Sequence, residues 1–325
     1  MTSTIWFSVL AVACGFALLV WGADRLVYGA SASALNLGFS PLVIGITIVG
    51  FGTSVPEMVV SAVAAFQGNP GLADGNAIGS NTANMGLILG IAALVQPLTV
   101  RSETLRREYP LMFAVMLLTL LLMLDLSLSR LDGMLLLAGL VGLTILVVRL
   151  GLCQNRRDPM ASEYKSEIPG RVPMGRSLFW LGLGLGVLLI SSRILVWGAV
   201  NIAYALGVSD FVIGLTIVAI GTSMPELATS VMSAVKKEHD IALGNILGSN
   251  MFNLLAVLGL SAAISPHRLE PLILRRDMVV MVAFSIGLFI MGFGFRGDGR
   301  VNRWEGALLL TAYLAYLLVL CRSLQ

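Results

Sequence analysis

The strongest constraint on how this chain can fold is an internal repeat whose two copies lie 169 residues apart. Residues 38–66 match residues 207–235 at 15 of 29 positions, and residues 71–90 match residues 240–259 at 9 of 20 positions. Two motifs carry the similarity: GTSVPE recurs as GTSMPE, and GNAIGSNTAN recurs as GNILGSNMFN. Because the polar residues match best, shared hydrophobicity does not explain the repeat.

The repeat is embedded in a chain that is too apolar for a water-soluble protein. Only 12% of its 325 residues are charged, against about 25% in soluble domains. Apolar stretches of roughly 20 residues, long enough to cross a bilayer, recur throughout, and their continuous character favours helices over the alternating strands of a barrel. We predict an all-α integral membrane protein with about ten transmembrane helices, near residues 5–30, 39–66, 72–96, 109–127, 131–150, 177–205, 210–235, 241–264, 278–295 and 304–321.

Each copy of the repeat contains five predicted spans, which is an odd number. A second copy that enters the membrane after an odd number of spans is inverted relative to the first. We therefore expect two inverted five-helix repeats, residues 1–150 and 177–325, joined by a loop at 151–176, with the repeated motifs at 38–90 and 207–259. Inverted repeats are common in secondary transporters, which bind their substrate near the membrane midplane between the repeats.

The distribution of basic residues predicts the orientation in the membrane. With loop 151–176 in the cytoplasm, 14 Lys and Arg residues lie inside and five lie outside. The positive-inside rule then places both termini on the extracytoplasmic side. The basic loop is thus explained by topology, and it does not indicate a nucleic-acid partner.

Each copy of the first motif places a glutamate, Glu57 or Glu226, within an apolar span. A carboxylate at the bilayer centre costs at least ~2.5 kcal/mol on insertion scales, so such residues are usually functional. Directly before them, Pro56 and Pro225 lack the N–H that would pair with the carbonyl four residues back. We expect a discontinuous helix at both places, because freed carbonyls survive in a membrane only where they are buried or line a cavity.

Neutral oxygen groups accompany the two carboxylates. Hydroxyl residues share a helical face with each glutamate, namely Thr53, Ser54, Thr222 and Ser223. In the spans that follow, a polar stripe recurs every four residues, formed by Asn76, Ser80 and Asn84 and by Asn245, Ser249 and Asn253. The remaining asparagines of the second motif, Asn81 and Asn250, are expected to join helices through hydrogen bonds.

The predicted site offers oxygen ligands, without an imidazole or a thiolate. Ca²⁺ takes six to eight oxygen ligands, whereas a transition metal would be expected to recruit His or Cys. Two glutamates neutralise one divalent ion, or they could support two or more monovalent ions in separate pockets. Competition between these two loads is a physical route to antiport.

At these motifs the chain resembles the cation/Ca²⁺ exchanger superfamily, the sodium/calcium exchangers, and it is most similar to the compact bacterial inner-membrane members. The resemblance covers nearly the whole chain. It implies an antiporter, rather than an enzyme, that exchanges several Na⁺ for one Ca²⁺ by alternating access in the inner (plasma) membrane, with no cofactor and no obligate protein partner. The ion ligands that it implies are Glu57, Glu226, Thr53, Ser54, Thr222, Ser223, Ser80, Asn84, Ser249, Asn253 and the carbonyls of Gly50 and Ala219.

The resemblance also bears on coupling and on motion. Potassium-dependent members carry Asp at one of the positions equivalent to Asn84 and Asn253, so Asn at both positions favours exchange without K⁺. The resemblance implies that the first and sixth spans pack loosely on the core and slide across it. A proton-coupled Ca²⁺ exchanger is the alternative, since a buried Glu can exchange Ca²⁺ for H⁺, but the surrounding neutral oxygens favour Na⁺.

An intramembrane hydrolase is the alternative from another functional class. It could use Ser54 or Ser223 as a nucleophile, but a nucleophilic serine needs a nearby base. We expect both histidines, His239 and His267, to be solvated loop residues, and neither hydroxyl has a lysine within its span. The sequence therefore favours transport over hydrolysis.

Overall fold

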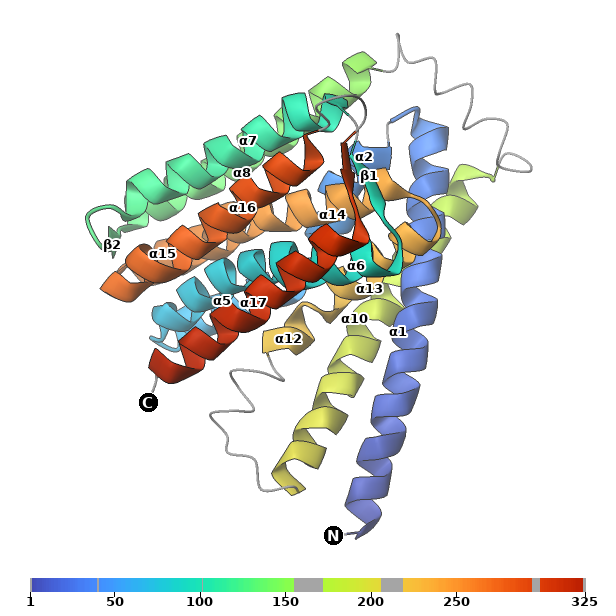
Figure 1. The fold of residues 1–325 in the computed structure, drawn as a ribbon, viewed down its shortest axis with the longest axis horizontal. Coiled ribbons are helices and arrows are strands. Elements are labelled where there is room, and N and C mark those ends of the chain that lie inside the picture. The colour runs from blue at the N-terminus through green and yellow to red at the C-terminus, as the bar shows by residue number, and fades with distance from the viewer. Residues whose placement is uncertain are drawn as a thin grey trace.

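The computed structural model describes residues 2–39, 41–100, 102–154, 172–205, 219–293 and 299–323, which are mostly helical, as predicted (Figure 1). The first repeat contains α1 (Thr2–Leu37), α2 (Pro41–Ile44), α3 (Gly50–Thr53), α4 (Val55–Phe66), α5 (Pro70–Ala83), α6 (Leu89–Val95), α7 (Ser102–Met123) and α8 (Arg130–Gln154). The second contains α10 (Met174–Ala205), α12 (Ala219–Thr222), α13 (Met224–Val235), α14 (His239–Phe252), α15 (Leu258–Ile264), α16 (Val279–Gly292) and α17 (Arg303–Ser323). Within the described residues, four π-helical segments adjoin these helices: η1 (Gly45–Val49), η2 (Asn84–Ile88), η4 (Asn253–Val257) and η5 (Ile273–Met278).

Several of these helices have the length and composition of membrane spans. Within the described ranges, six helices are long and apolar enough to cross a bilayer, or seven if the bent pair Gly45–Thr53 and Val55–Phe66 forms one span. The predicted span 210–235 falls partly on residues 206–218, and most of the predicted loop 151–176 falls on residues 155–171; both segments lie outside the described residues. The count of ten spans therefore stays a prediction.

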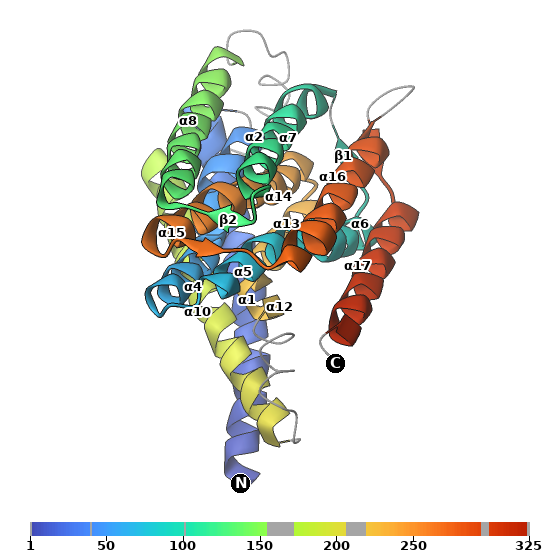
Figure 2. The ribbon, with the colours of Figure 1, turned by 90° about the vertical axis from the view of Figure 1, so that its left-hand side faces the viewer.

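The helices α1 and α10 lie side by side, and their lower ends extend beyond the other helices (Figure 1, Figure 2). Small residues allow their backbones to approach. A Cβ added to Gly184 would clash with the Leu26 backbone nitrogen, and one added to Gly15 would lie 3.0 Å from the Leu195 backbone nitrogen. These two contacts are equivalent under the 169-residue offset. The two helices are therefore held together by the same close packing at both places.

Two short antiparallel sheets join the repeats to each other. β1 (Leu98–Val100) pairs with β4 (Gly299–Val301), and β2 (Ser127–Leu128) pairs with β3 (His267–Arg268). β3 begins at the repeat equivalent of Leu98, so the two sheets follow the same symmetry as the helices. The sequence analysis did not predict these strands.

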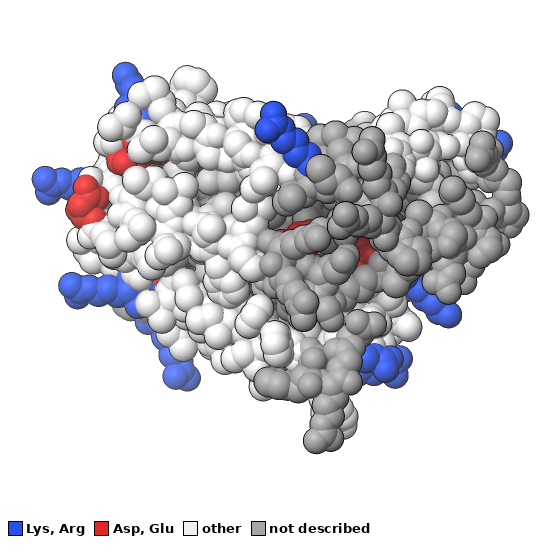
Figure 3. Space-filling view, turned by 90° about the horizontal axis from the view of Figure 1, so that it is seen from above, with Lys and Arg blue, Asp and Glu red and all other residues white. Residues whose placement is uncertain are grey.

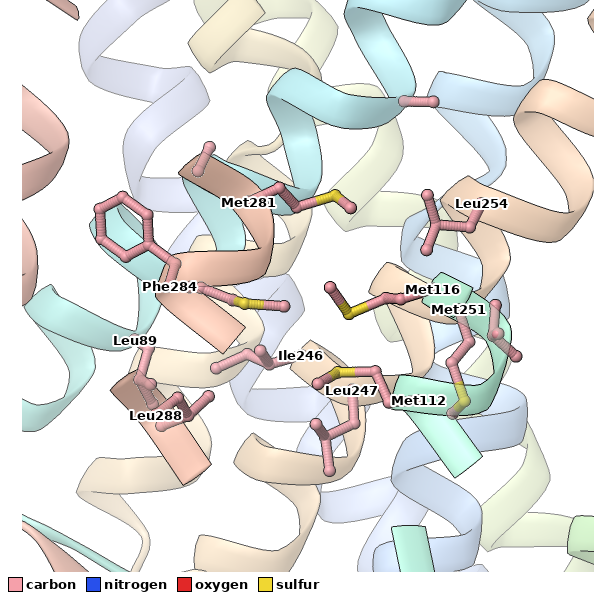
Figure 4. Packing of buried hydrophobic residues seen from close by; sticks show 14 of the residues in the cluster. Leu89, Met112, Met116, Ile246, Leu247, Met251, Leu254, Met281, Phe284 and Leu288 are labelled. Atoms are coloured by element: carbon pink, nitrogen blue, oxygen red, sulfur yellow. The ribbon is translucent and has the colours of Figure 1, made fainter. Parts of the chain in front are cut away.

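The core lies where helices of the two repeats meet. Figure 4 shows Met112 and Met116 of α7, Met251 of α14 and Met281 of α16 directed toward one another among aliphatic side chains. Methionine is unbranched and flexible, so it fills irregular gaps between helices.

The outer surface is largely apolar. On the face shown in Figure 3, charged side chains are few among the described residues, and Lys and Arg project at its edges. Large apolar side chains are exposed on the outer helices, including Trp6 of α1 at 74% and Trp304 of α17 at 85%. Such a surface suits contact with lipid, and tryptophan near helix ends suits the membrane interface. The chain is a membrane protein.

Candidate cation site

Both predicted helix breaks are present, and each falls at a serine. In the first repeat α3 ends at Thr53, α4 begins at Val55, and the two helical segments meet at 49°. Ser54 between them has φ −83° and ψ 1°, and its repeat equivalent Ser223 has nearly the same conformation, φ −90° and ψ 7°. The discontinuous helices expected from sequence are confirmed.

The physical cause of each break is the proline of the motif. Pro56 cannot donate to the Gly52 carbonyl, and it occupies the first turn of α4, where a missing N–H costs nothing. Pro225 has the same place in α13. Each break therefore sets a glutamate in the first turn of a new helix, whose N-terminal dipole favours negative charge.

The two glutamates are buried and are reached by hydroxyls from the opposite repeat. Glu57 is 1% exposed and Glu226 is 2% exposed. Ser54 Oγ donates to Glu226 Oε1 at 3.3 Å, and Ser223 Oγ donates to Glu57 Oε1 at 3.4 Å. These two hydrogen bonds are exchanged by the 169-residue offset, so the pseudo-two-fold axis of the repeats passes between the two carboxylates.

The remaining carboxylate oxygens have no hydrogen-bond donor among the described residues. Glu57 Oε2 and Glu226 Oε2 are both buried without a partner, as are Asn84 Oδ1 and Asn253 Oδ1. The described ion pairs do not involve either glutamate. Burying acceptor oxygens without a donor is costly, and a cation bound between them would remove that cost.

The asparagines of the second motif join the two repeats. Asn84 Nδ2 donates to Asn250 Oδ1 at 3.0 Å, and Asn253 Nδ2 donates to Asn81 Oδ1 at 3.1 Å. Asn81 Nδ2 also donates to the Asn250 carbonyl at 3.1 Å. The predicted joining role of Asn81 and Asn250 is confirmed. These bonds turn the amide oxygens of Asn84 and Asn253 away from protein donors.

Asn84 and Asn253 also lie where the helix geometry changes. Each is the first residue of a π-helical segment, η2 or η4. Such segments are rare and often occur at functional sites. The two asparagines thus share a backbone setting as well as a side-chain partner.

Two further asparagines hydrogen-bond to the backbone carbonyls of the glutamates. Asn76 Nδ2 donates to the Glu57 carbonyl at 3.3 Å and to Ser61 Oγ at 3.0 Å. Asn245 Nδ2 makes the equivalent contacts to Glu226 and Ser230, at 3.3 Å and 2.9 Å. Ser61 and Ser230 were missed by the sequence reasoning, although the alignment of the two copies contains them.

The other predicted ligands lie around this centre, less symmetrically. Thr53 Oγ1 lies 3.0 Å from Asn245 Oδ1 and 3.5 Å from Ser249 Oγ, and Ser249 Oγ donates to the Gly50 carbonyl at 3.4 Å. Thr222 is the last residue of α12, directly before the helix break at Ser223. Ser80 Oγ donates to Asn76 Oδ1 at 3.5 Å, one turn back on α5. Ala219 is the first residue of α12, at the position equivalent to Gly50.

This donor set is made of oxygens rather than of a classical metal cluster. Within the described residues, no group of three or more His, Cys, Asp or Glu side chains could hold a metal ion. A cation between Glu57 and Glu226 would therefore be completed by hydroxyl, amide and carbonyl oxygens. Hard cations such as Ca²⁺ and Na⁺ accept these ligands.

One expectation about the histidines was wrong. His267 is not a solvated loop residue: its side chain is 9% exposed, and its Nε2 lies 2.7 Å from Oδ2 of Asp74, which is 1% exposed. The β2–β3 pairing folds the loop over the start of α5 and buries the pair. The other histidine, His239, is the first residue of α14.

Asp24 and Arg25 of α1 form a local ion pair, and Asp24 has a second basic partner. Arg25 Nε lies 3.1 Å from Asp24 Oδ2, and the Arg25 guanidinium also stacks on Trp21 and Trp180. Lys236 Nζ lies 2.8 Å from Asp24 Oδ1. Sequence reasoning missed Lys236 because 212 residues separate it from Asp24.

Comparison with known proteins places this geometry in a family. The sequence profile described as sodium/calcium exchanger protein matches residues 7–149 and 176–322, which are the two repeats. The chain is 47% identical to the putative antiporter CaxA of Alkalimonas amylolytica, covering 97% of this chain and 99% of the relative. It is 33% identical to the sodium/calcium exchanger MaX1 of Methanosarcina acetivorans, covering 98% and 99%.

Two further comparisons are with an inner membrane protein and with a solved structure. The inner membrane protein YrbG of Escherichia coli (strain K12) is 41% identical, with 94% of each chain covered. Among solved structures, the sodium-calcium exchanger NCX_Mj soaked with Na⁺ and Sr²⁺ superposes with a TM-score of 0.82 at 31% identity, covering 96% of this chain and 98% of that one.

Proposed function

Because the chain belongs to the sodium/calcium exchanger family, we propose that it exchanges Na⁺ for Ca²⁺ across the membrane by alternating access. Membership makes it a cation antiporter of the Ca²⁺-exchanging type; the choice of Na⁺ as the coupling ion is our inference. Neutral hydroxyl and amide oxygens around the carboxylates support Na⁺, which needs such ligands. The sodium/calcium exchanger MaX1 is similar over its full length.

The observation that carries the proposal is the reciprocal pair of hydrogen bonds between the repeats, Ser54 to Glu226 and Ser223 to Glu57. Each bond engages one carboxylate oxygen and leaves the other without a donor among the described residues. The two free oxygens carry the charge needed for one Ca²⁺. The same oxygens could be shared among several Na⁺, so that the two loads exclude each other.

We propose the following roles for the predicted residues. Glu57 and Glu226 are the shared ligands of either load. Ten further residues complete the oxygen shells, through side chains or carbonyls: Thr53, Ser54, Thr222, Ser223, Ser80, Asn84, Ser249, Asn253, Gly50 and Ala219.

The orientation in the membrane belongs to the same proposal. The excess of basic residues in loop 151–176 and in the other predicted inside loops supports a cytoplasmic loop with both termini extracytoplasmic. The similarity to the inner membrane protein YrbG supports an inner-membrane location. Residues 1–150 and 177–325 would then be two inverted units, and Asn at both 84 and 253 supports exchange without K⁺.

The test is ion-driven Ca²⁺ uptake. Inside-out vesicles containing the protein are loaded with Na⁺, diluted into Na⁺-free buffer, and the entry of radioactive Ca²⁺ is followed, with K⁺-loaded vesicles as the control. We expect uptake that requires the Na⁺ gradient. Uptake that ignores Na⁺ and follows an imposed pH gradient would establish the proton-coupled alternative instead.

A further inference from the structure

The two helices that carry the glutamates present repeat-equivalent faces to different surroundings. On α13, Met224, Ala228 and Met232 pack against the apolar cluster formed by α1 and α10. On α4 the equivalents of the last two are Val59 and Val63, which are 45% and 47% exposed. The pair of helices α1 and α10 therefore covers this face of α13 and leaves the equivalent face of α4 open.

An ion pair holds the covered side. Lys236 is the C-terminal cap of α13, and its Nζ lies 2.8 Å from Asp24 Oδ1 and 2.9 Å from the Asp24 carbonyl oxygen of α1. The two side chains are 28% and 30% exposed, so the pair is partly shielded from water. It ties α1 to the end of the helix that carries Glu226.

The repeat equivalents of this pair cannot form the same contact. Asp24 corresponds to Arg193 of α10, and Lys236 corresponds to Gln67, which follows α4. Both residues are exposed in this structure. If the two repeats exchanged conformations, α10 would cover α4. Arg193 would then lie next to the neutral amide of Gln67, rather than next to a side chain of opposite charge.

A second polar contact has the same bias. Ser192 Oγ of α10 donates to the Gly221 carbonyl at 3.0 Å, and Gly221 lies at the break before α13. The repeat equivalent of Ser192 is Ala23, which has no hydroxyl to offer Gly52. Both contacts therefore exist in the arrangement seen here. In the exchanged arrangement the ion pair is replaced by an arginine beside a neutral amide, and the serine is replaced by an alanine.

We propose that Asp24 and Lys236 form a one-sided lock that favours this arrangement of α1 and α10 over its symmetry-related opposite. The lock sets which side of the membrane the resting transporter faces, and Ser192 reinforces it. This inference rests on the proposed alternating access, because a lock between two arrangements matters only if both are visited. A contact that is present in only one of two states changes the free-energy difference between them by its own contribution.

The experiment measures the positions of α1 without requiring transport. Spin labels are attached to Trp6→Cys of α1 and Leu131→Cys of α8, both highly exposed, in protein whose Cys14, Cys153 and Cys321 are replaced by Ser. Distances are measured by double electron–electron resonance in ion-free proteoliposomes. The first distance population corresponds to the arrangement seen here, and the second to its symmetry-related opposite. Lys236→Gln introduces the residue found at the equivalent position of the first repeat. We expect it to raise the ratio of the second population to the first by roughly threefold to fivefold, the effect of losing a partly exposed ion pair.

Three further variants make the result specific. Lys237→Gln removes an equal charge from the neighbouring exposed residue and should leave the ratio unchanged. The double variant Asp24→Lys with Lys236→Asp keeps a pair of opposite charges between the helices and should bring the ratio closer to the wild-type value than Asp24→Lys alone does. Gln67→Glu, which removes no existing contact, should favour the second population by giving Arg193 a carboxylate partner there.

The outcomes separate the lock from the proposed function. Unchanged distances in both Lys236→Gln and Gln67→Glu, or an equal shift in Lys237→Gln, would overturn the lock even if Na⁺-driven uptake is found. A shift in both variants would support the lock even if the coupling ion proves to be H⁺.

Discussion

Ser54 of the first repeat donates to the carboxylate of Glu226 in the second, 172 residues away, and Ser223 returns the same bond to Glu57. Neither repeat contains the whole of the proposed site, because the serine of each repeat donates to the glutamate of the other. Substitutions at equivalent positions should therefore have similar effects.

The first prediction concerns the carboxylates. Glu57→Gln and Glu226→Gln keep the shape of the side chain but remove its charge, so each should lower ion-driven Ca²⁺ uptake by at least about 100-fold, since loss of one charged ligand costs several kcal/mol. Expression and chromatographic behaviour in detergent should stay normal. Asp132→Asn on the exposed start of α8 is the matched control. Normal uptake by either glutamine variant would contradict the site assignment.

The second prediction concerns the crossed serines. Hydrogen bonds to charged groups contribute about 1.5–3 kcal/mol, so Ser54→Ala and Ser223→Ala should each weaken the apparent Ca²⁺ affinity by about tenfold or more. The control that deletes a hydroxyl is Thr144→Ala, because the Thr144 hydroxyl donates to the Leu140 carbonyl of its own helix. A large effect at one serine and none at the other would show that the two halves of the site are not equivalent.

The third prediction concerns the asparagines that join the repeats. Asn81→Leu leaves the Asn250 carbonyl and Asn253 Nδ2 without their partner, which should cost about 1–3 kcal/mol of stability. The measurement is thermal unfolding in detergent. Asn69→Ala, at an exposed helix cap without a side-chain bond, should unfold at the wild-type temperature.

The fourth prediction concerns the contact between α1 and α10. Gly184→Ala would set a methyl group into the Leu26 backbone nitrogen, whereas the methyl group of Gly186→Ala on the same helix would meet nothing within 4 Å. The first variant should separate the two helices, lowering both the unfolding temperature and uptake. The second should resemble wild type, and equal loss in both variants would instead indicate a general intolerance of α10 to alanine.

The fifth prediction concerns pH. Burial lowers the pKa of His267, but the hydrogen bond and charge of Asp74, together with the Ser265 carbonyl, outweigh it, so the pKa is raised above 6.5. The protonated pair therefore stabilises the fold fully below about pH 6.5, and this contribution is lost as the pH rises through the raised pKa. Unfolding temperatures measured from pH 5 to pH 9 should fall less steeply in His267→Gln than in wild type. His239→Gln is the control, and an unchanged pH profile in His267→Gln would contradict the assignment.

The repeated offset made the helix breaks predictable, and it indicated the centre of the proposed site. A proline, a glycine and a carboxylate in one apolar segment have several explanations, but the second copy reduces them to one, because inverted copies bring equivalent residues to the same axis. Glu57, Ser54 and their partners could be named for that reason. The hydrogen bonds of Asn81 and Asn250 followed from the same alignment.

Other contacts could not be predicted because no local pattern specifies them. The strands β1 and β2 have three and two residues, too short for alternation to be visible. Asp74 and His267 lie 193 residues apart, and Leu243 stands at the position equivalent to Asp74, so the repeat gave no second example. Asp24 and Lys236 likewise have no equivalent ion pair in the other repeat, so the alignment of the two copies did not indicate their contact.

The sheets between the repeats also constrain how the protein is made. β1 emerges from the ribosome about 200 residues before its partner β4, and at about 5–20 residues per second the interval is roughly 10–40 seconds. Throughout that time the predicted spans of the first repeat must remain in the bilayer while Asn81, Asn84 and the β1 strand edge have no partner from the second repeat. Biogenesis of this transporter is therefore a problem of holding an unfinished half until its inverted copy arrives.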